Sequence, residues 1–154
     1  MNIDTTLLNI LPVLKSVYEK KMPFNKHIGL KIDTLTPDET IMRIDMDSHL
    51  IGNYSKNVLH GGVLSSIIDV TGGLMASVEL LKRIAGSTPE EIAKRLGGMA
   101  TIDMRVDFLR PGKGSFFLAK GKVIRCGARI ALIQIDVFAD NETHVATGLA
   151  NYKL

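Results

Sequence analysis

One stretch of the chain combines small residues with a single carboxylate at helical spacing. Its members recur three or four positions apart and therefore share one face of a predicted helix: Gly62, Ser65, Ser66, Asp69, Gly72, Gly73 and Ala76. The Asp69 carboxylate has the chemistry of a general base or a nucleophile. Two consecutive glycines inside a helix cost roughly 1 kcal/mol each relative to alanine, so Gly72 and Gly73 indicate a group that approaches this backbone closely. A substrate, a partner helix or an enclosing sheet would each explain them.

The start of the same helix carries a second chemical feature. His60 is followed by Gly61 and Gly62, which lack side chains and leave the first backbone N–H groups of the helix uncovered. A helix N-terminus offers free donors and a partial positive charge, which can stabilise the oxyanion formed during acyl transfer. A flexible start of the helix is the alternative explanation for the two glycines.

Gly61 and Asp69 are complementary parts of an acyl-transfer site, but one subunit cannot bring them together. They are eight residues apart, which corresponds to about 12 Å along a helix axis. Two subunits whose helices run antiparallel would bring Gly61 of one near Asp69 of the other. The sequence therefore predicts an active site shared between two subunits.

The elements that position this helix follow from the periodicity of the apolar residues. The N-terminal segment, residues 1–26, is predicted to dock through an amphipathic helix over residues 3–21, with Pro12 in or near its first turns and these residues near one face: Leu7, Leu8, Leu11, Leu14 and Val17. Alternation with period two then predicts a hairpin of strands near 28–32 and 42–46 around a turn at Pro37 and Asp38. A loop over 49–59 leads into the central helix, residues 60–81.

The second half of the chain is predicted to consist mainly of strands. Thr88, Pro89 and Glu91 form the pattern of a capping box with proline at the first helical position, so a short helix is expected to about Leu96. Alternating runs near 98–110, 115–126, 129–139 and 143–153 predict an antiparallel meander. Without a repeat or a long linker, this order predicts one α+β domain over residues 1–154, with a curved antiparallel sheet around one central helix.

Composition excludes several classes of function. Cys126 is the only cysteine among 154 residues, which excludes an intramolecular disulfide and a cysteine-based zinc site and suits a reducing cytoplasm. The net charge of +3 comes from scattered Lys and Arg with 5% aromatic residues, a pattern unlike that of nucleic-acid binders. We expect no signal peptide and no membrane span, because the N-terminal apolar stretch is interrupted by Asn9 and Pro12 and no apolar run reaches about 18 residues.

The segment from Asn57 to Asp69, Asn-Val-Leu-His-Gly-Gly-Val-Leu-Ser-Ser-Ile-Ile-Asp, resembles the signature of hotdog-fold acyl-CoA thioesterases of the phenylacetate-degradation type. The resemblance covers roughly residues 27 to 153, and an aromatic residue followed by a Pro-Gly turn, as in Phe108 to Gly112, supports it. It implies a hotdog fold, dimers that form a continuous sheet, and often a pairing of dimers into tetramers. The acyl-CoA would be the substrate, with no metal and no cofactor beyond the coenzyme A that it carries.

The resemblance also implies roles for particular residues. Asp69 would be the general base or nucleophile, the Gly61 amide would polarise the thioester carbonyl, and Thr101 would orient the attacking water. Relatives carry Asn or Gln six residues before the His, where this chain has Tyr54 with Asn53 beside it, so Asn53 is the expected substitute. His60 would shape the loop through hydrogen bonds. The expected substrate and CoA contacts come from the helix start and from two surface turns: Gly62, Ser66, Arg110, Lys113, Arg125, Gly127 and Arg129.

A non-catalytic acyl-CoA sensor is the main alternative. Sensors of this fold carry a DNA-binding segment, and the residues before His27 are too few and too apolar for a helix-turn-helix. A hydratase of this fold would need a His five residues after an Asp, and an α/β-hydrolase would need a Gly-x-Ser-x-Gly elbow; the sequence has neither. The aliphatic composition with seven Met favours a lipid-like acyl group over an aromatic one.

Overall fold

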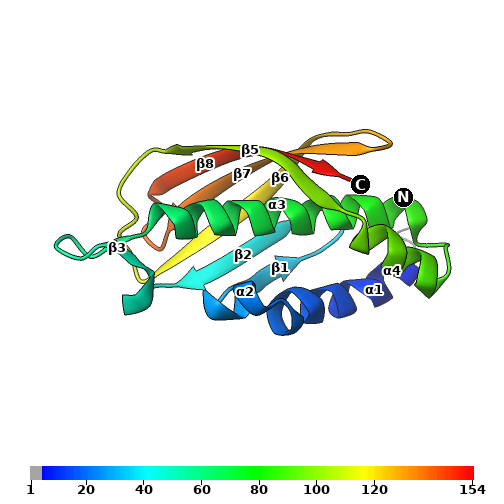
Figure 1. Cartoon of the computed structure of the whole chain (residues 1–154), viewed down its shortest axis with the longest axis horizontal. Helices are drawn as coiled ribbons and strands as arrows, with labels where there is room; N and C mark the ends of the chain where they lie inside the picture. The colour runs from blue at the N-terminus through cyan, green and yellow to red at the C-terminus, as the bar shows by residue number, and fades with distance from the viewer. Residues whose placement is uncertain (1–4) are drawn as a thin grey trace.

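Six antiparallel strands form one curved sheet that wraps around a long helix (Figure 1). The computed structural model describes residues 5–154. The strands lie side by side in the order β1-β2-β6-β7-β8-β5 and have these bounds: β1 Lys31–Leu35, β2 Thr40–Asp45, β5 Ala100–Phe108, β6 Phe116–Cys126, β7 Ile130–Ala139 and β8 His144–Lys153. This is the hotdog architecture that the sequence predicts.

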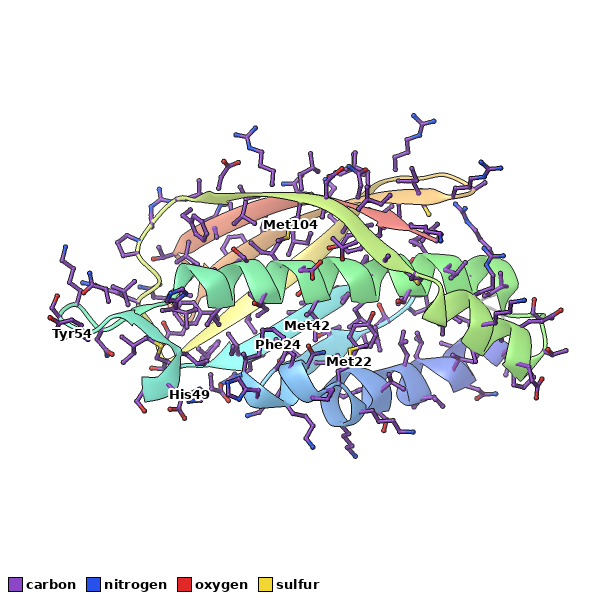
Figure 2. The ribbon with its side chains drawn as sticks, viewed as in Figure 1. Met22, Phe24, Met42, His49, Tyr54 and Met104 are labelled. Atoms are coloured by element: carbon purple, nitrogen blue, oxygen red, sulfur yellow. The ribbon has the colours of Figure 1, made fainter. Side chains whose placement is uncertain are left out.

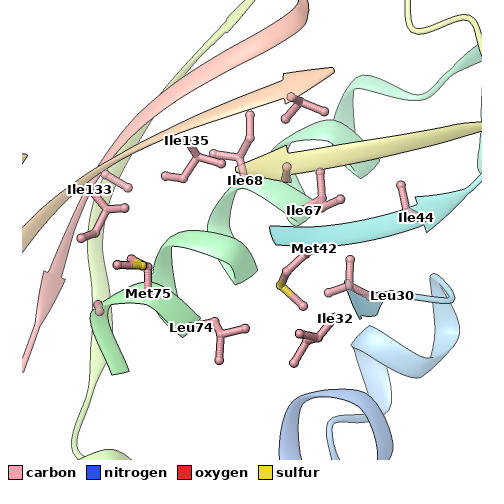
Figure 3. Close-up of a cluster of buried hydrophobic side chains, with 14 of the residues drawn as sticks. Leu30, Ile32, Met42, Ile44, Ile67, Ile68, Leu74, Met75, Ile133 and Ile135 are labelled. Atoms are coloured by element: carbon pink, nitrogen blue, oxygen red, sulfur yellow. The ribbon is translucent and has the colours of Figure 1, made fainter. Parts of the chain in front are cut away.

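The long helix is α3, Gly61–Ile84, and it supplies much of the core. Figure 3 shows Ile67 and Ile68 of α3 beside Met42 of β2 and Ile135 of β7, all fully buried. Strand β7 buries every second residue, as the period of two predicts. By length and composition α3 could cross a membrane, but 61% of its most apolar window lies buried inside the domain. Its apolar character is that of a core helix.

The last four strands do not form the simple meander that the sequence predicts. Strands β6, β7 and β8 follow one another as expected, but β5 pairs with β8, and β6 instead pairs with β2. Alternation shows that a strand exists but carries no information on its neighbour, which explains the error. As a result, β5 is one edge of the sheet, and it exposes Ile102 and Phe108 there.

The N-terminal segment folds into three short helices instead of one. α1, Thr5–Ser16, continues into a π-helical turn, η1, Val17–Lys21, and α2, Pro23–His27, follows. Leu7, Leu11 and Leu14 are buried as predicted, but Leu8 is 47% exposed and Pro12 lies well inside α1. Residues 3 and 4, where the helix was predicted to begin, lie outside the described residues. The first strand begins at Lys31 and not near 28, because α2 ends at His27 and a turn at residues 28 and 29, with Gly29 at positive φ, follows it.

Two connections complete the fold. The predicted loop over 49–59 contains a 3-10 turn, η2, Ser48–Leu50, and a small hairpin of β3, Ile51–Asn53, and β4, Val58–Leu59. The short helix is α4, Pro89–Gly97, and both hydrogen bonds of its predicted capping box, between Thr88 and Glu91, are present. The hairpin leads directly into the N-terminus of α3, and α4 leads from the end of α3 to β5.

The two helical glycines of α3 have different surroundings. Tyr152 of β8 is 2% exposed, and its ring covers Gly72, where an added Cβ would lie 2.1 Å from the tyrosine Oη and 2.7 Å from Cζ. At Gly73 an added Cβ would lie no closer than 3.6 Å to any neighbour, which is an ordinary contact. The enclosing sheet therefore accounts for Gly72, whereas Gly73 has room for a Cβ in ordinary contact with Tyr152 and Tyr18.

We expect Gly72→Ala to destabilise the protein and Gly73→Ala to stabilise it. The first forces the buried Tyr152 ring to move, at a cost of about 1–3 kcal/mol, while the second gains about 0.5–1 kcal/mol of helix propensity without a clash. Urea unfolding at one protein concentration measures the free energy of unfolding of both variants. Both replace a glycine by alanine and so change the unfolded chain in the same way, which makes each variant the control for the other. Equal stabilities would contradict the packing argument.

Candidate active site

Asp69 is half-buried on α3, with its carboxylate held by β5. The Thr101 hydroxyl, near the start of β5, donates a 2.8 Å hydrogen bond to Asp69 Oδ1. The Tyr152 hydroxyl donates to the Asp69 backbone oxygen at 2.9 Å, which fixes this turn of α3 as well. No Lys, Arg or His among residues 5–154 forms an ion pair with Asp69. The carboxylate is thus oriented by one donor and keeps acceptor positions for water or substrate.

Two buried tyrosines lie beside this carboxylate. Burial raises the pKa of Tyr152, and the negative charge of Asp69 raises it further. Burial also raises the pKa of Tyr18, against the opposing effect of its hydrogen bond with Ser77, and the charge of Asp69 adds to the rise. Both phenols therefore stay neutral at physiological pH, and Asp69 supplies the negative charge at this place. Neither tyrosine is predicted as a site residue from the sequence.

The N-terminus of α3 leaves one backbone donor available. The N–H groups of His60, Gly62 and Val63 donate to Leu50 O, His60 Nδ1 and His60 O at 2.9, 2.8 and 2.9 Å. Of the first N–H groups of the helix, that of Gly61 has no acceptor among residues 5–154. It is therefore the donor that can bind an oxyanion.

His60 is the N-cap of α3. Because its Nδ1 accepts the Gly62 N–H, this nitrogen carries no proton, and the ring orders the start of the helix. Gly62 is exposed, and the Ser66 hydroxyl donates to Gly62 O at 2.7 Å, one turn before Asp69. These residues lie on the face of α3 that also carries Asp69.

A cavity of about 340 Å³ opens beside Gly61. Phe108 of β5 forms one wall, and an added Cβ at Gly61 would lie 3.3 Å from its ring. Arg110 lines the same cavity and donates to His144 O at 3.1 Å, and the exposed Lys113 follows in the same turn. The first pair of predicted CoA-binding cations therefore lies near the Gly61 donor.

The second predicted CoA turn lies at the opposite end of the sheet. Arg125, Gly127 and Arg129 lie at the connection of β6 to β7, near the C-terminal end of α3, where Arg83 donates to the Gly127 and Cys126 oxygens. The eleven residues of β6 separate this turn from the one with Lys113. One subunit does not bring the two predicted groups together.

Asn53 is occupied within the β3–β4 hairpin. Its Oδ1 accepts hydrogen bonds from Ser55 Oγ at 2.9 Å and from Lys56 N at 3.1 Å. Figure 2 shows Tyr54 at the tip of this hairpin, beyond the N-terminal end of α3, and its side chain is 93% exposed. Within one subunit Asn53 lies at the end of the molecule that carries Gly61 and not beside Asp69.

The described residues contain no cluster suited to a metal ion. In residues 5–154, no three side chains of His, Cys, Asp or Glu lie close enough together to hold one. The chemistry that the site offers is that of a carboxylate, a hydroxyl and a backbone donor. This set can activate water and stabilise an oxyanion.

Comparisons with known proteins agree with this fold and chemistry. The family model described as Thioesterase superfamily matches residues 56–146. The medium/long-chain acyl-CoA thioesterases YigI of Salmonella typhimurium and Escherichia coli are each 30% identical to this chain over 152 residues, covering 99% of it and 98% of each relative. A crystal structure of a Shewanella oneidensis protein related to the thioesterase superfamily superposes with a TM-score of 0.93 at 37% identity, covering 97% of each chain. The chain therefore belongs to the thioesterase superfamily and is a thioester hydrolase.

Proposed function

We propose that this protein hydrolyses medium- and long-chain acyl-CoA thioesters. The observation that carries the proposal is the pair formed by the oriented Asp69 carboxylate and the available Gly61 N–H, the two groups that thioester hydrolysis needs. The named activity of the YigI relatives supplies the substrate class. The YigI relatives match nearly the whole chain, including the N-terminal helices, so the likeness extends beyond the catalytic helix.

The complete site requires a second subunit. Gly61 and Asp69 are separated by about 12 Å along the straight helix α3, which is too far for both to contact one carbonyl. The edge strand β5 has no neighbour on its outer side among the described strands and exposes apolar residues there, as an edge that pairs with a second copy would. Pairing that runs the α3 helices antiparallel supplies the Gly61 of the partner subunit to each Asp69.

Each group then has a defined part in the reaction. Asp69 accepts a proton from a water molecule whose oxygen attacks the thioester carbon, and Thr101 holds the carboxylate in position for this transfer. The Gly61 N–H of the partner subunit donates to the carbonyl oxygen as it becomes negative. The C–S bond breaks on collapse of the intermediate, and the CoA thiolate leaves with little need for a protonating group. In the alternative, Asp69 attacks the carbonyl carbon itself, the CoA thiolate leaves, and water then hydrolyses the acyl-aspartyl anhydride to release the acid and restore Asp69.

The CoA portion would lie on the side of the Gly61 donor. Arg110 and Lys113 lie near that donor, and their charges suit the phosphates of CoA. The partner subunit's Asn53 would arrive at the same end, because the β3–β4 hairpin precedes α3. The second predicted group of CoA contacts could reach the bound CoA only from the subunit that supplies Asp69: Arg125, Gly127 and Arg129.

Release of CoA thiol from acyl-CoAs of increasing length and from an aromatic acyl-CoA tests the proposed activity. We expect hydrolysis that increases from butanoyl-CoA to dodecanoyl-CoA and is weak for phenylacetyl-CoA. A panel without any hydrolysis, together with measurable binding of dodecanoyl-CoA, would contradict the enzyme and favour the acyl-CoA sensor. Preferential hydrolysis of the aromatic substrate would contradict the substrate class alone.

A further inference from the structure

We propose that the acyl tail of the substrate lies in the cavity between the N-terminal helices and α4. The cavity has a volume of about 700 Å³, within the usual range for small-ligand sites. Ile10 and Val13 of α1 form one wall, Ile92 and Leu96 of α4 form another, and Ser77 of α3 lies at its base. This assignment rests on the proposed thioesterase function and adds the place where chain length is recognised.

The lining of the cavity suits a hydrocarbon chain. No acidic or basic side chain of the described chain lines it, and the polar groups in its wall are hydroxyls and backbone. Val13 lines the cavity yet is 61% exposed, which marks the rim as open and apolar. A charged or strongly polar ligand would lose its hydration here without gaining a partner, whereas each buried CH₂ of an acyl tail gains roughly fourfold in affinity.

One face of α3 leads from this cavity to the catalytic carboxylate. Asp69, Gly73 and Ser77 are spaced by four residues on α3 and follow one another along one face. Gly73 presents no side chain, and an added Cβ there would lie 3.8 Å from Tyr18 Oη. Tyr18 lines the cavity and is hydrogen-bonded to Ser77 Oγ at 3.1 Å. The proposed tail would run from the carbonyl at Asp69 along this face of α3, past Gly73 and Tyr18, into the cavity.

Hydrogen bonds and a buried side chain hold the helices that form the cavity. The Ser77 hydroxyl donates to Gly73 O at 2.8 Å, Asn25 of α2 donates to Tyr18 O at 3.0 Å, and Leu14 is buried against the core. The α4 wall is fixed by its capping box at Thr88. The cavity thus has two walls from segments outside the sheet, and residues on them can be enlarged without changing the core.

Enlarging Ala93 tests the assignment. Ala93 is an exposed residue of α4 that lines the cavity, so Ala93→Trp is expected to fill the cavity while the fold is retained. We expect kcat/KM for butanoyl-CoA to stay within about twofold of wild type and that for hexadecanoyl-CoA to fall at least about tenfold, the loss of two or more buried CH₂ groups. Lys94→Trp, the next residue on α4 and outside the lining, is the control, and the ratio between the two substrates cancels any uniform effect of its charge. An unchanged ratio in a folded Ala93→Trp protein would overturn the assignment.

Binding of dodecanoate to the wild type and to Ala93→Trp separates this inference from the proposed activity. Hydrolysis with an unaltered chain-length profile and equal dodecanoate binding would leave the thioesterase in place and reject the cavity. An absence of hydrolysis, with dodecanoate bound by the wild type and at least about tenfold more weakly by Ala93→Trp, would reject the activity and support an acyl site. Val13→Trp, on the opposite wall, repeats the test if Ala93→Trp does not fold.

Discussion

Replacing Asp69 by asparagine is expected to lower kcat for acyl-CoA hydrolysis by roughly 10²–10⁴-fold, the usual contribution of a positioned general base. The amide has nearly the same shape as the carboxylate and can still accept the hydrogen bond from Thr101, but it cannot take a proton from water. Tyr152 donates to the backbone oxygen of Asp69 and not to its side chain, so its contact with α3 is retained. Steady-state thiol release measures the loss, and thermal unfolding checks that the protein remains folded.

The matched control is Asp33→Asn. Asp33 is an exposed residue of β1, the edge of the sheet opposite to β5, and we expect this change to leave kcat and KM within about twofold of wild type, as for other surface changes. Activity near the wild-type level in Asp69→Asn would remove the carboxylate from the mechanism. An equal loss in both variants would point to a general effect of charge and not to proton transfer.

The central helix and the capping box could be predicted because the signals that specify them are local. The periodicity of the apolar residues around Ile67 and Leu74 and the pattern from Thr88 to Glu91 determine helical structure without reference to distant parts of the chain. The neighbours of β5 depend instead on how the sheet closes around α3, which alternation within one strand does not report. The strands and the pairings of β1 with β2, β6 with β7 and β7 with β8 were therefore predicted, whereas the pairings of β5 with β8 and of β6 with β2 were not.

The candidate site shows the same division between local and tertiary information. His60, Gly61 and Asp69 are part of one sequence motif, and the structure places the Thr101 hydroxyl on the Asp69 carboxylate. The role of Thr101 in orienting water stays a prediction. Tyr152 comes from the last strand and Tyr18 from a π-helical turn, and nothing in their local sequence marks their approach to α3. Gly72 and Gly73 were the sequence signal for a close contact, which a substrate, a partner helix or the sheet could each explain. The ring of Tyr152 over Gly72 identifies the sheet as that contact. Membership of the phenylacetate-degradation type of thioesterases stays a prediction.

Replacing Gly61 by proline is expected to lower kcat by roughly 10²–10³-fold, the typical effect of losing one oxyanion donor. Proline has no N–H, yet it is favoured at the first position of a helix, which Gly61 occupies. The preceding residue, His60, has φ −64° and ψ 135°, which is the backbone region that proline requires before it. Gly61→Ala is the control, because it adds the same Cβ next to Phe108 but keeps the N–H, and it should retain most of the activity. Equal losses in the two variants would indicate that space, and not the donor, matters at this position.

Purified heterodimers made from these variants decide whether the site is shared between subunits. A heterodimer of Asp69→Asn and Gly61→Pro chains contains one site with both groups intact if each site draws on two subunits, so it should have about half of the wild-type activity. If each site lay within one subunit, that heterodimer would be inactive. Pairing a wild-type chain with an Asp69→Asn/Gly61→Pro chain reverses the expectation: a shared arrangement leaves no intact site, and a single-subunit arrangement leaves one. Each heterodimer contains one substituted and one unsubstituted copy of position 69, and likewise of position 61. The difference in activity between the two heterodimers therefore reports only which subunit supplies each group.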